Sequence, residues 1–386
     1  MMLALTADRL LSPLEVIEQP VVLIEEGGIL EIASQSERAI PPQARRLDWS
    51  GLVLAPGYVD IHVHGSAGHD VMSDDPAGLR AMQTMLARHG VTSYFPTTVT
   101  ASDDATLHAL ERLGSAIEQA ASDSNWNGAR PLGIHLEGPF LSHARRGVHP
   151  VAQLQPPTLE RFDRFWQASR GQIKMMTIAP ELPGALTVIA EATRRGVCVS
   201  LGHSDATLAE AMQGLDAGGR HATHTFNAMR PLNHRDPGIL GAVLTEDRLS
   251  ADIIADGIHV DRAIVRMFLK LKGAALSVLI TDGIAATGMP EGTYRLGPLE
   301  VEVKDGRCMS GGSLAGSVLT MDRAVRNVME FAEWNLAAAV RLATLNPAQA
   351  AGIPGAGRLM AGAVADLVGL SPQGEVCQAM LRGRMA

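Results

Sequence analysis

The sequence predicts an α/β fold, a (β/α)8 TIM-type barrel that carries a small β-sandwich domain built from both chain termini. Two patterns predict the barrel: apolar β-type runs alternate with alanine- and leucine-rich helical stretches, and polar side chains gather where the apolar runs end. The chain of 386 residues is longer than the roughly 250 residues of a typical barrel, which leaves room for an appended domain. We therefore expect one large domain and one small one.

Eight apolar runs supply the predicted barrel strands, which is enough to close a barrel. They cover residues 59–64, 92–98, 132–137, 173–178, 197–203, 222–226, 250–255 and 276–282. The helical stretches include residues 75–88 and 208–217, and a long helix is expected over residues 320–341, after the last strand.

Both ends of the chain have the pattern of β-hairpins. Short apolar runs at residues 21–24 and 29–32 flank a Glu-Glu-Gly-Gly turn, and near the other end a Ser-Pro-Gln-Gly turn separates residues 365–370 from a run through residue 381. Such hairpins can pair in one sheet. We therefore assign residues 1–52 and 355–386 to the small domain and residues 53–354 to the catalytic barrel.

Composition excludes several classes of protein. A net charge of -8 without a basic patch argues against nucleic acid as a partner. The three cysteines, Cys198, Cys308 and Cys377, form no CxxC pair and suit a reducing cytoplasm. The N-terminal residues lack the features of a signal peptide, and no stretch approaches the ~18 uncharged apolar residues of a membrane helix. We expect a soluble cytoplasmic protein.

The first predicted strand carries a histidine pair. His62 and His64 are two residues apart, so both imidazoles lie on the same face of the strand. Inside a barrel such a pair can bind a divalent metal through nitrogen. The alternative is a pair of hydrogen-bonded core histidines.

Three further strands end in candidate metal ligands. Glu137 ends the third strand, where a buried carboxylate needs a cation or hydrogen-bond donors, and His203 and His224 fall at the ends of the fifth and sixth. His135 lies deeper than Glu137 and is expected to support it by a hydrogen bond. His221 has the opposite parity to His224, so one of these two is expected to be structural.

Asp282 closes the eighth predicted strand, at the end where barrel enzymes place their catalytic groups. A carboxylate beside a metal-activated water can accept its proton and return it to a leaving amine. The alternative is an ordinary turn residue before Gly283. Because the ends of parallel barrel strands meet at one mouth, the conjunction of these groups favours catalysis.

Several longer motifs add a family resemblance. They are Pro-Gly-Tyr-Val-Asp-Ile-His-Val-His-Gly at residues 56–65, His-Leu-Glu-Gly-Pro-Phe at 135–140, Leu-Gly-His-Ser-Asp-Ala at 201–206 and Thr-His-Thr-Phe-Asn-Ala-Met at 223–229. With these motifs the chain resembles the amidohydrolase superfamily and, within it, the N-acetylglucosamine-6-phosphate deacetylases. The resemblance covers nearly the whole chain.

The resemblance implies a metal-dependent hydrolase with zinc or iron as the divalent metal, one or two ions per subunit. Glu137, His203 and His224 would hold one ion, while His62 and His64 would hold a second ion that Glu137 bridges.

The resemblance also assigns the remaining site residues. Asp282 would be the catalytic acid and base, and His149 would bind substrate and polarise its acetyl carbonyl. Asn227 and Ala228 would contact the sugar phosphate. Arg235 and His259 would bind the phosphate, shared across the subunits of a homodimer. Without the resemblance, these last two would be a surface arginine and a capping histidine.

Three alternatives to an N-acetyl-D-glucosamine 6-phosphate deacetylase stay open from the sequence. One is the same reaction on N-acetylgalactosamine 6-phosphate, because the two sugars differ only at C4. Another is an amidohydrolase acting on a cyclic amide or amidine, against which Arg235 and His259 count. The last is a metal-free barrel that serves as a binding protein.

Overall fold

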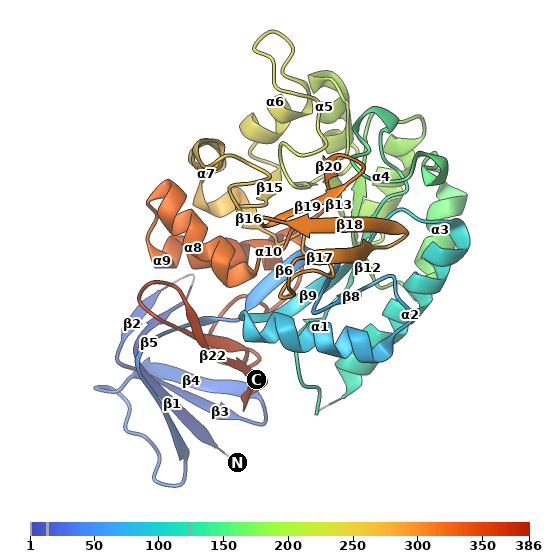
Figure 1. Ribbon diagram of the computed structural model, residues 1–386. Coiled ribbons are helices and arrows are strands. Elements are labelled where there is room, and N and C mark those ends of the chain that lie inside the picture. The colour runs from blue at the N-terminus through green and yellow to red at the C-terminus, as the bar shows by residue number, and fades with distance from the viewer. Residues whose placement is uncertain (1, 13–14, 124) are drawn as a thin grey trace.

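The computed structural model describes residues 2–12, 15–123 and 125–386, and its centre is a barrel of parallel strands (Figure 1). The strands pair in the order β6, β9, β11, β12, β13, β14, β15 and β16, and the short β10 (Arg130–Pro131) lies beside β9. Their bounds are Tyr58–Val63, Val91–Thr98, Ile134–Glu137, Ile173–Ile178, Cys198–Leu201, His221–Ala222, Ser250–Ile253 and Ser277–Leu279. The predicted fold class is confirmed, and each strand falls on a predicted run.

The seam between the first and last strands closes just beyond their ends. The N–H of His64 donates to the carbonyl of Gly283 at 2.8 Å, and the N–H of Asp282 donates to the carbonyl of His62 at 2.9 Å. The side chain of Asp60 strengthens this seam, since it accepts the Thr281 hydroxyl at 2.5 Å. Three residues of the predicted site, His62, His64 and Asp282, therefore take part in closing the barrel.

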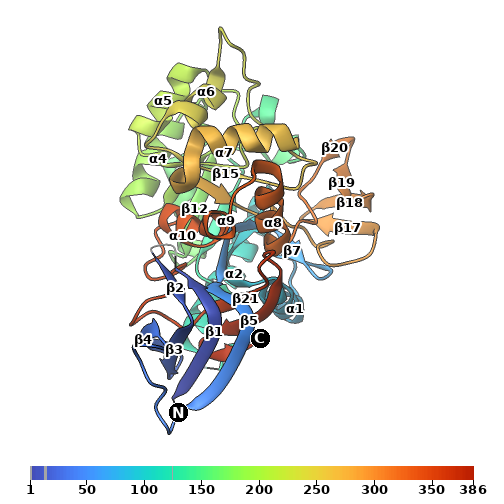
Figure 2. The same ribbon diagram turned by 90° about the vertical axis from the view of Figure 1, so that its left-hand side faces the viewer.

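Helices surround the barrel and cover the outer faces of its strands (Figures 1 and 2). They are α1 Pro76–Arg88, α2 Asp103–Ser122, α3 Leu159–Ala168, α4 Ala185–Arg194, α5 Leu208–Asp216, α6 Gly238–Thr245, α7 Arg262–Leu276, α8 Met321–Ala332, α9 Leu336–Ala343 and α10 Leu345–Ala350, with short 3-10 turns η1 His143–Arg145 and η2 Val151–Gln153. In the part of the chain that the structure describes, no helix combines the length and apolarity needed to cross a membrane.

The long helix predicted over residues 320–341 is wrong in one respect, because the structure has two helices there. Glu333 leaves the helical conformation with φ 58°, which ends α8. The side chain of Asn335 then accepts the N–H of Ala338 and caps the start of α9. Asparagine is a strong N-cap residue, so this cap is the physical reason for the break.

The two chain ends meet in one eight-stranded sheet, as predicted, with the order β23, β22, β21, β5, β1, β3 and β4, and β2 beside β1. The bounds are β1 Leu3–Leu11, β2 Val16–Glu18, β3 Pro20–Glu25, β4 Gly28–Ser34, β5 Arg45–Pro56, β21 Leu367–Leu370, β22 Val376–Leu381 and β23 Arg384–Met385. Trp49 and Leu54 belong to the buried core of this sheet. Strand β5 runs through the predicted boundary at residues 52 and 53, and the domain limits remain a prediction.

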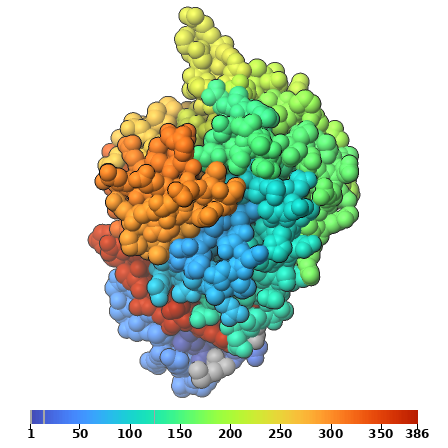
Figure 3. Space-filling view, turned by 45° about the vertical axis from the view of Figure 1, so that its right-hand side comes forward, coloured from blue at the N-terminus to red at the C-terminus, as the bar shows by residue number. Residues whose placement is uncertain are grey.

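A third sheet, which the sequence analysis did not predict, lies between β16 and α8. Its four antiparallel strands are β17 Gly292–Leu296, β18 Leu299–Lys304, β19 Arg307–Ser310 and β20 Ser313–Leu314. It has its own buried core, which includes Val301 and Cys308. In Figure 3 this sheet (orange) covers one face of the barrel beside the blue segment that contains the small β7 (Gly65–Ser66) and β8 (His69–Asp70) pair.

Candidate metal centre and active site

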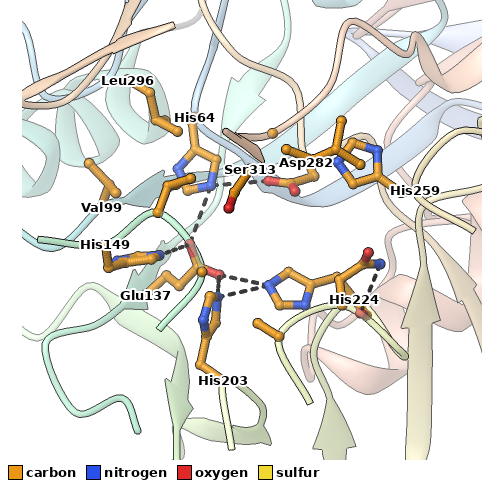
Figure 4. Close-up of a pocket in the computed structure, with 16 residues that line it drawn as sticks. His64, Val99, Glu137, His149, His203, His224, His259, Asp282, Leu296 and Ser313 are labelled. Atoms are coloured by element: carbon orange, nitrogen blue, oxygen red, sulfur yellow. Dashed lines mark hydrogen bonds and ion pairs between the residues drawn. The ribbon is translucent and has the colours of Figure 1, made fainter. Parts of the chain in front are cut away.

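A cavity of about 230 Å³ opens at the carboxyl ends of the barrel strands. This is the end at which (β/α)8 enzymes assemble their active sites. Polar groups from the strand ends form one part of its wall, and apolar side chains from neighbouring loops and from the third sheet form another (Figure 4). The lining residues are His64, Val99, Glu137, Gly147, Val148, His149, His203, His224, Asn227, Ala228, His259, Asp282, Leu296, Ser313, Leu314 and Gly316.

Glu137 is the centre of the polar wall. Its Oε1 lies 3.2 Å from Nε2 of His203 and 3.2 Å from Nε2 of His224. Its Oε2 lies 3.3 Å from Nε2 of His64 and 3.6 Å from Nε2 of His149. Figure 4 shows these imidazoles converging on the one carboxylate.

A second group of ligand atoms adjoins the first. Nε2 of His62 and Nε2 of His64 are 3.2 Å apart, and Oδ1 of Asp282 lies 3.5 Å and 3.2 Å from them, respectively. Nε2 of His62 is also 3.5 Å from Oε1 of Glu137. Glu137 therefore contacts both groups, the arrangement required of a bridging carboxylate.

The tautomers of two histidines indicate what these groups bind. Nδ1 of His64 lies 3.0 Å from the carbonyl of Thr97, and Nδ1 of His203 lies 3.0 Å from the carbonyl of Arg145. Because a carbonyl oxygen only accepts, each Nδ1 carries a proton, so the neutral form of each ring has its lone pair on Nε2. In that form the lone pairs point at oxygens of Glu137, a repulsive contact unless a proton or a metal ion lies between them; for His64, burial opposes the charged form, but Asp282 and Glu137 raise its pKa well above the ordinary value. The donor set thus fits a divalent metal.

The electrostatics of the site agree with that fit. Burial favours the neutral form of His203 and lowers its pKa to about 4, so its lone pair is free at neutral pH. Burial acts in the same direction on His224, but the carboxylate of Glu137 outweighs it and raises the pKa of His224 to about 9. This raised pKa reflects a negative potential that a divalent metal would neutralise in place of protons.

The carboxylates of the site are ionised. Burial opposes ionisation of Asp282, but the facing imidazole of His64 and the other nearby imidazoles lower its pKa to about 2. For Glu137 as well, the surrounding imidazoles overcome burial and hold the pKa well below its ordinary value. Asp282 is therefore in the form that a proton acceptor requires.

Three of these residues have backbone conformations that are rare outside glycine. The φ angles are 47° at His203, 29° at His224 and 49° at Asp282. Such conformations cost on the order of 1 kcal/mol or more and cluster at functional sites. They occur where the chain leaves each strand, and they turn the side chains toward the barrel axis.

Two buried carboxylates that the sequence analysis did not assign support these residues. Asp60 accepts the N–H of His62 at 3.3 Å, and Asp252 accepts the backbone N–H of His224. Both are fully buried. The signal that could have found them is an aspartate inside an otherwise apolar strand, where burial demands several donors.

His135 and His221 are not ligands in this geometry. His135 bonds the carbonyl of Ile61 at 3.0 Å and the hydroxyl of Thr177 at 2.8 Å. The sequence analysis expected it to bond Glu137 instead. Its ring packs edge-on against His62, with the centroids 4.6 Å apart. His221 is the structural member of its pair, because its Nε2 lies 2.9 Å from Oδ2 of Asp252.

Of the residues predicted to bind substrate, some line the cavity and one does not. Asn227, Ala228 and His259 line the cavity. Nδ1 of His259 bonds Asp256 at 2.7 Å, which leaves Nε2 available to a ligand. Arg235 is exposed and does not line this cavity. It belongs to the loop before α6, which projects from the body of the molecule in Figures 1 and 3.

Comparison with known proteins identifies the family of the chain. Residues 53–386 match the model of the Amidohydrolase family. The chain is 39% identical over 353 residues to N-acetylglucosamine-6-phosphate deacetylase of Lysinibacillus sphaericus, covering 91% of this chain and 89% of that protein. It is 37% identical over 373 residues to N-acetylgalactosamine-6-phosphate deacetylase of Escherichia coli O157:H7, covering 95% and 97%.

The match to a solved structure leads to the same family. A mutant N-acetyl-D-glucosamine-6-phosphate deacetylase from Mycobacterium smegmatis, in complex with N-acetyl-D-glucosamine 6-phosphate, superposes with a TM-score of 0.91. The two are 35% identical, and the match covers 100% of this chain and 99% of that chain. The chain therefore belongs to the amidohydrolase family, in the group formed by these deacetylases.

Proposed function

We propose that the protein hydrolyses N-acetyl-D-glucosamine 6-phosphate to D-glucosamine 6-phosphate and acetate, a step of amino-sugar catabolism. The observation that carries this proposal is the convergence of Glu137, its surrounding imidazoles and Asp282 on one cavity. The relatives from Lysinibacillus sphaericus and Mycobacterium smegmatis support the choice of substrate.

The cavity has surfaces that suit both parts of the amide. Val99 and Leu296 lie beside His64 and His149 in Figure 4 and offer an apolar wall for the acetyl methyl group. Asn227, which also lines the cavity, offers an amide to the polar sugar. The acetyl carbonyl would then lie between His149 and the ligand groups around Glu137.

Each polar residue has a role in hydrolysis. A bound divalent metal supplies a Lewis acid, which makes water a better nucleophile at neutral pH and polarises the carbonyl. Asp282 accepts a proton from the attacking water and returns it to the departing amine nitrogen. His149 donates a hydrogen bond to the carbonyl oxygen as negative charge develops there.

We propose zinc or iron as the metal, since imidazole and carboxylate ligands suit both. Glu137, His203 and His224 form one binding position. His62 and His64, with Glu137 as the shared ligand, form a second position, so one or two ions can bind per subunit.

We further propose a cytoplasmic homodimer. His259 lines the cavity and Arg235, on the loop before α6, does not, which supports the proposal that Arg235 reaches a phosphate in the cavity of the partner subunit. An arginine fork matches phosphate geometry, and a histidine beside it adds another donor.

The test is acetate release by protein of measured metal content, with N-acetylglucosamine 6-phosphate, N-acetylgalactosamine 6-phosphate and a cyclic amide as parallel substrates. We expect rapid turnover of the first, loss of turnover on chelation, and recovery when zinc or iron is restored. Metal-loaded protein that releases no acetate from either sugar phosphate would contradict the proposal.

The galactosamine epimer is the second candidate, because the relative from Escherichia coli O157:H7 is 37% identical over 95% of this chain. A higher kcat/KM for that sugar in the same assay would assign the protein to it.

A further inference from the structure

Thr100, which follows strand β9, contacts the ring of His149 through its hydroxyl and its backbone N–H. The hydroxyl Oγ1 of Thr100 is 2.7 Å from Nδ1 of His149, and the backbone N of Thr100 is 3.3 Å from the same nitrogen. Both residues are buried, with 2% of Thr100 and 3% of His149 exposed. The bonding of His149 at Nδ1 is therefore determined inside the protein and not by solvent.

The backbone contact identifies the tautomer, which the shorter contact with the hydroxyl helps to stabilise. A peptide N–H can only donate, so Nδ1 of His149 accepts and has no proton of its own. If Nδ1 carried the proton, it would face the N–H of Thr100, and a buried donor would lose its acceptor, which is costly. In the neutral ring the proton is thus on Nε2, the nitrogen that faces Glu137 and the cavity.

This tautomer separates His149 from the histidines around it. His203 donates through Nδ1 and keeps its lone pair on Nε2, whereas His149 accepts at Nδ1 and presents N–H at Nε2. Both rings lie near Glu137, and by distance alone Glu137, His149 and His203 could form a three-ligand set. A nitrogen that carries a proton has no lone pair for a metal, so His149 is a donor and not a ligand.

The surroundings hold this arrangement in place. A Cβ atom on Gly138 would lie 2.0 Å from Oγ1 of Thr100, so the absence of a side chain there leaves room for the hydroxyl. The ring of His149 also packs edge-on against that of His203, with centroids 4.8 Å apart. The backbone N–H of His149 donates to the carbonyl of Arg146 at 3.1 Å, which fixes the loop backbone.

We propose that Thr100 is a positioning residue for the reaction, which fixes His149 as the Nε2–H tautomer and directs that N–H at the acetyl carbonyl oxygen. The proposal rests on the deacetylation proposed above. Thr100 itself touches neither substrate nor metal in this scheme. The hydrogen bond from His149 strengthens only as charge develops on the oxygen. A ring with its proton on Nδ1 instead of Nε2 would therefore lower kcat and leave KM unchanged.

The kinetic test compares three variants of the zinc-loaded enzyme. Thr100→Val removes the hydroxyl at nearly constant volume but leaves the backbone donor, so kcat should fall about ten-fold, the effect of one hydrogen bond, with KM and zinc content unchanged. Thr100→Ser restores the hydroxyl and should restore kcat. Thr98→Val is the matched control, because the buried Thr98 hydroxyl has no hydrogen-bond partner among the described residues, and it should retain wild-type kcat.

The direct test is ¹⁵N NMR of histidine-labelled, zinc-loaded enzyme, with the His149 signals identified by their loss in His149→Gln. We expect Nδ1 of His149 without a proton and Nε2 with one, and a mixture of tautomers in Thr100→Val. A proton on Nδ1 in the wild type, wild-type kcat in Thr100→Val, or an equal loss in Thr98→Val would overturn the proposal. The NMR result does not depend on turnover, so an enzyme without deacetylase activity would refute the proposed function and leave the tautomer assignment to be judged separately.

Discussion

The carboxylate of Asp252 accepts the backbone N–H of His224, so a residue inside strand β15 fixes the chain where it leaves β14. The second oxygen of Asp252 lies 2.9 Å from Nε2 of His221. The left-handed conformation of His224 thus depends on a buried carboxylate. Groups that orient a ligand in this way commonly change metal affinity when they are replaced.

We predict that Asp252→Asn weakens metal binding by about 10- to 100-fold. The amide keeps the volume of the carboxylate, but only its oxygen accepts a hydrogen bond, so it cannot replace both carboxylate oxygens toward the His224 backbone and His221. Competition with a chelator of known affinity measures the effect. Asp216→Asn, an exposed position at the end of α5, should leave affinity unchanged, and equal affinities for the two variants would refute this role of Asp252.

Asp282→Asn should lower turnover by at least ~10²-fold, because an amide of the same shape cannot carry the proton from water to the amine. Metal content and the far-UV circular dichroism spectrum should match the wild type. Near-normal kcat in this variant would mean that another group transfers the proton.

Arg235→Ala should act on only one of two substrates. The phosphate lies far from the amide bond, so its binding energy can position the acetyl group for reaction. We expect wild-type kcat/KM to be far higher for N-acetylglucosamine 6-phosphate than for N-acetylglucosamine, and the variant to narrow that difference by slowing only the phosphorylated sugar. Equal wild-type kinetics on the two sugars would refute the phosphate assignment.

Mixed dimers test whether Arg235 acts in the partner's cavity. Arg235→Ala and Asp282→Asn chains, each weak alone, should regain activity when they exchange subunits, because each hybrid has one cavity with both groups intact. Activity should rise with the fraction of hybrid measured by native mass spectrometry. Proven exchange without recovery would refute the sharing of Arg235 while leaving its role in phosphate binding open to the kinetic comparison.

From the contact between His89 and Asp322 we predict a contribution to the free energy of unfolding that depends on pH. Nδ1 of His89, at the end of α1, is 2.9 Å from Oδ1 of Asp322 in the first turn of α8. Burial raises the pKa of Asp322, but the hydrogen bond from His89 outweighs it and lowers the pKa below 3.8. A lowered pKa means that the ionised form is stabilised by folding, so this contribution is present above about pH 4 and is lost as the pH falls through the folded-state pKa.

Asp322→Asn should therefore lower the free energy of unfolding by about 1 kcal/mol at pH 7, and the difference from wild type should shrink toward pH 3. Urea unfolding at both pH values measures it. The pair of His108 and Asp74 is largely exposed, so Asp74→Asn serves as the control with a smaller effect. A difference for Asp322→Asn that stays constant with pH would show that the carboxylate's charge is not responsible.

The barrel could be predicted from the sequence because parallel strands buried on both faces appear as continuous apolar runs. The third sheet was missed although β18 alternates between exposed and buried positions and an Asp305-Gly306 turn follows it. These strands are short and half exposed, so their pattern is weak beside that of the barrel. The break at Glu333 was missed because helix periodicity continues through both α8 and α9.

The candidate ligands could be anticipated because they stand where polar residues interrupt apolar strands at one end of the barrel. The role of Thr100 could not, since it depends on which side-chain atom of a distant segment Thr100 meets. Asp252 could be noticed as an aspartate inside an apolar strand, but its contact with the backbone of His224 could not be foreseen. Arg235 and His259 show another limit. Arg235 lies outside the cavity that His259 lines, and a phosphate site shared across subunits, as proposed for these two, would have no geometric signature in a single subunit.

The shared terminal sheet has a consequence for how the protein is made. Residues 53–56 of β5 pair with residues 367–370 of β21, so one edge of β5 lacks its partner until residues 367–370 have been synthesised. Contacts between such distant segments form slowly, and an unpaired strand edge can associate with other chains meanwhile. On the ribosome, the barrel can begin to form before the sheet that precedes it in the sequence is complete.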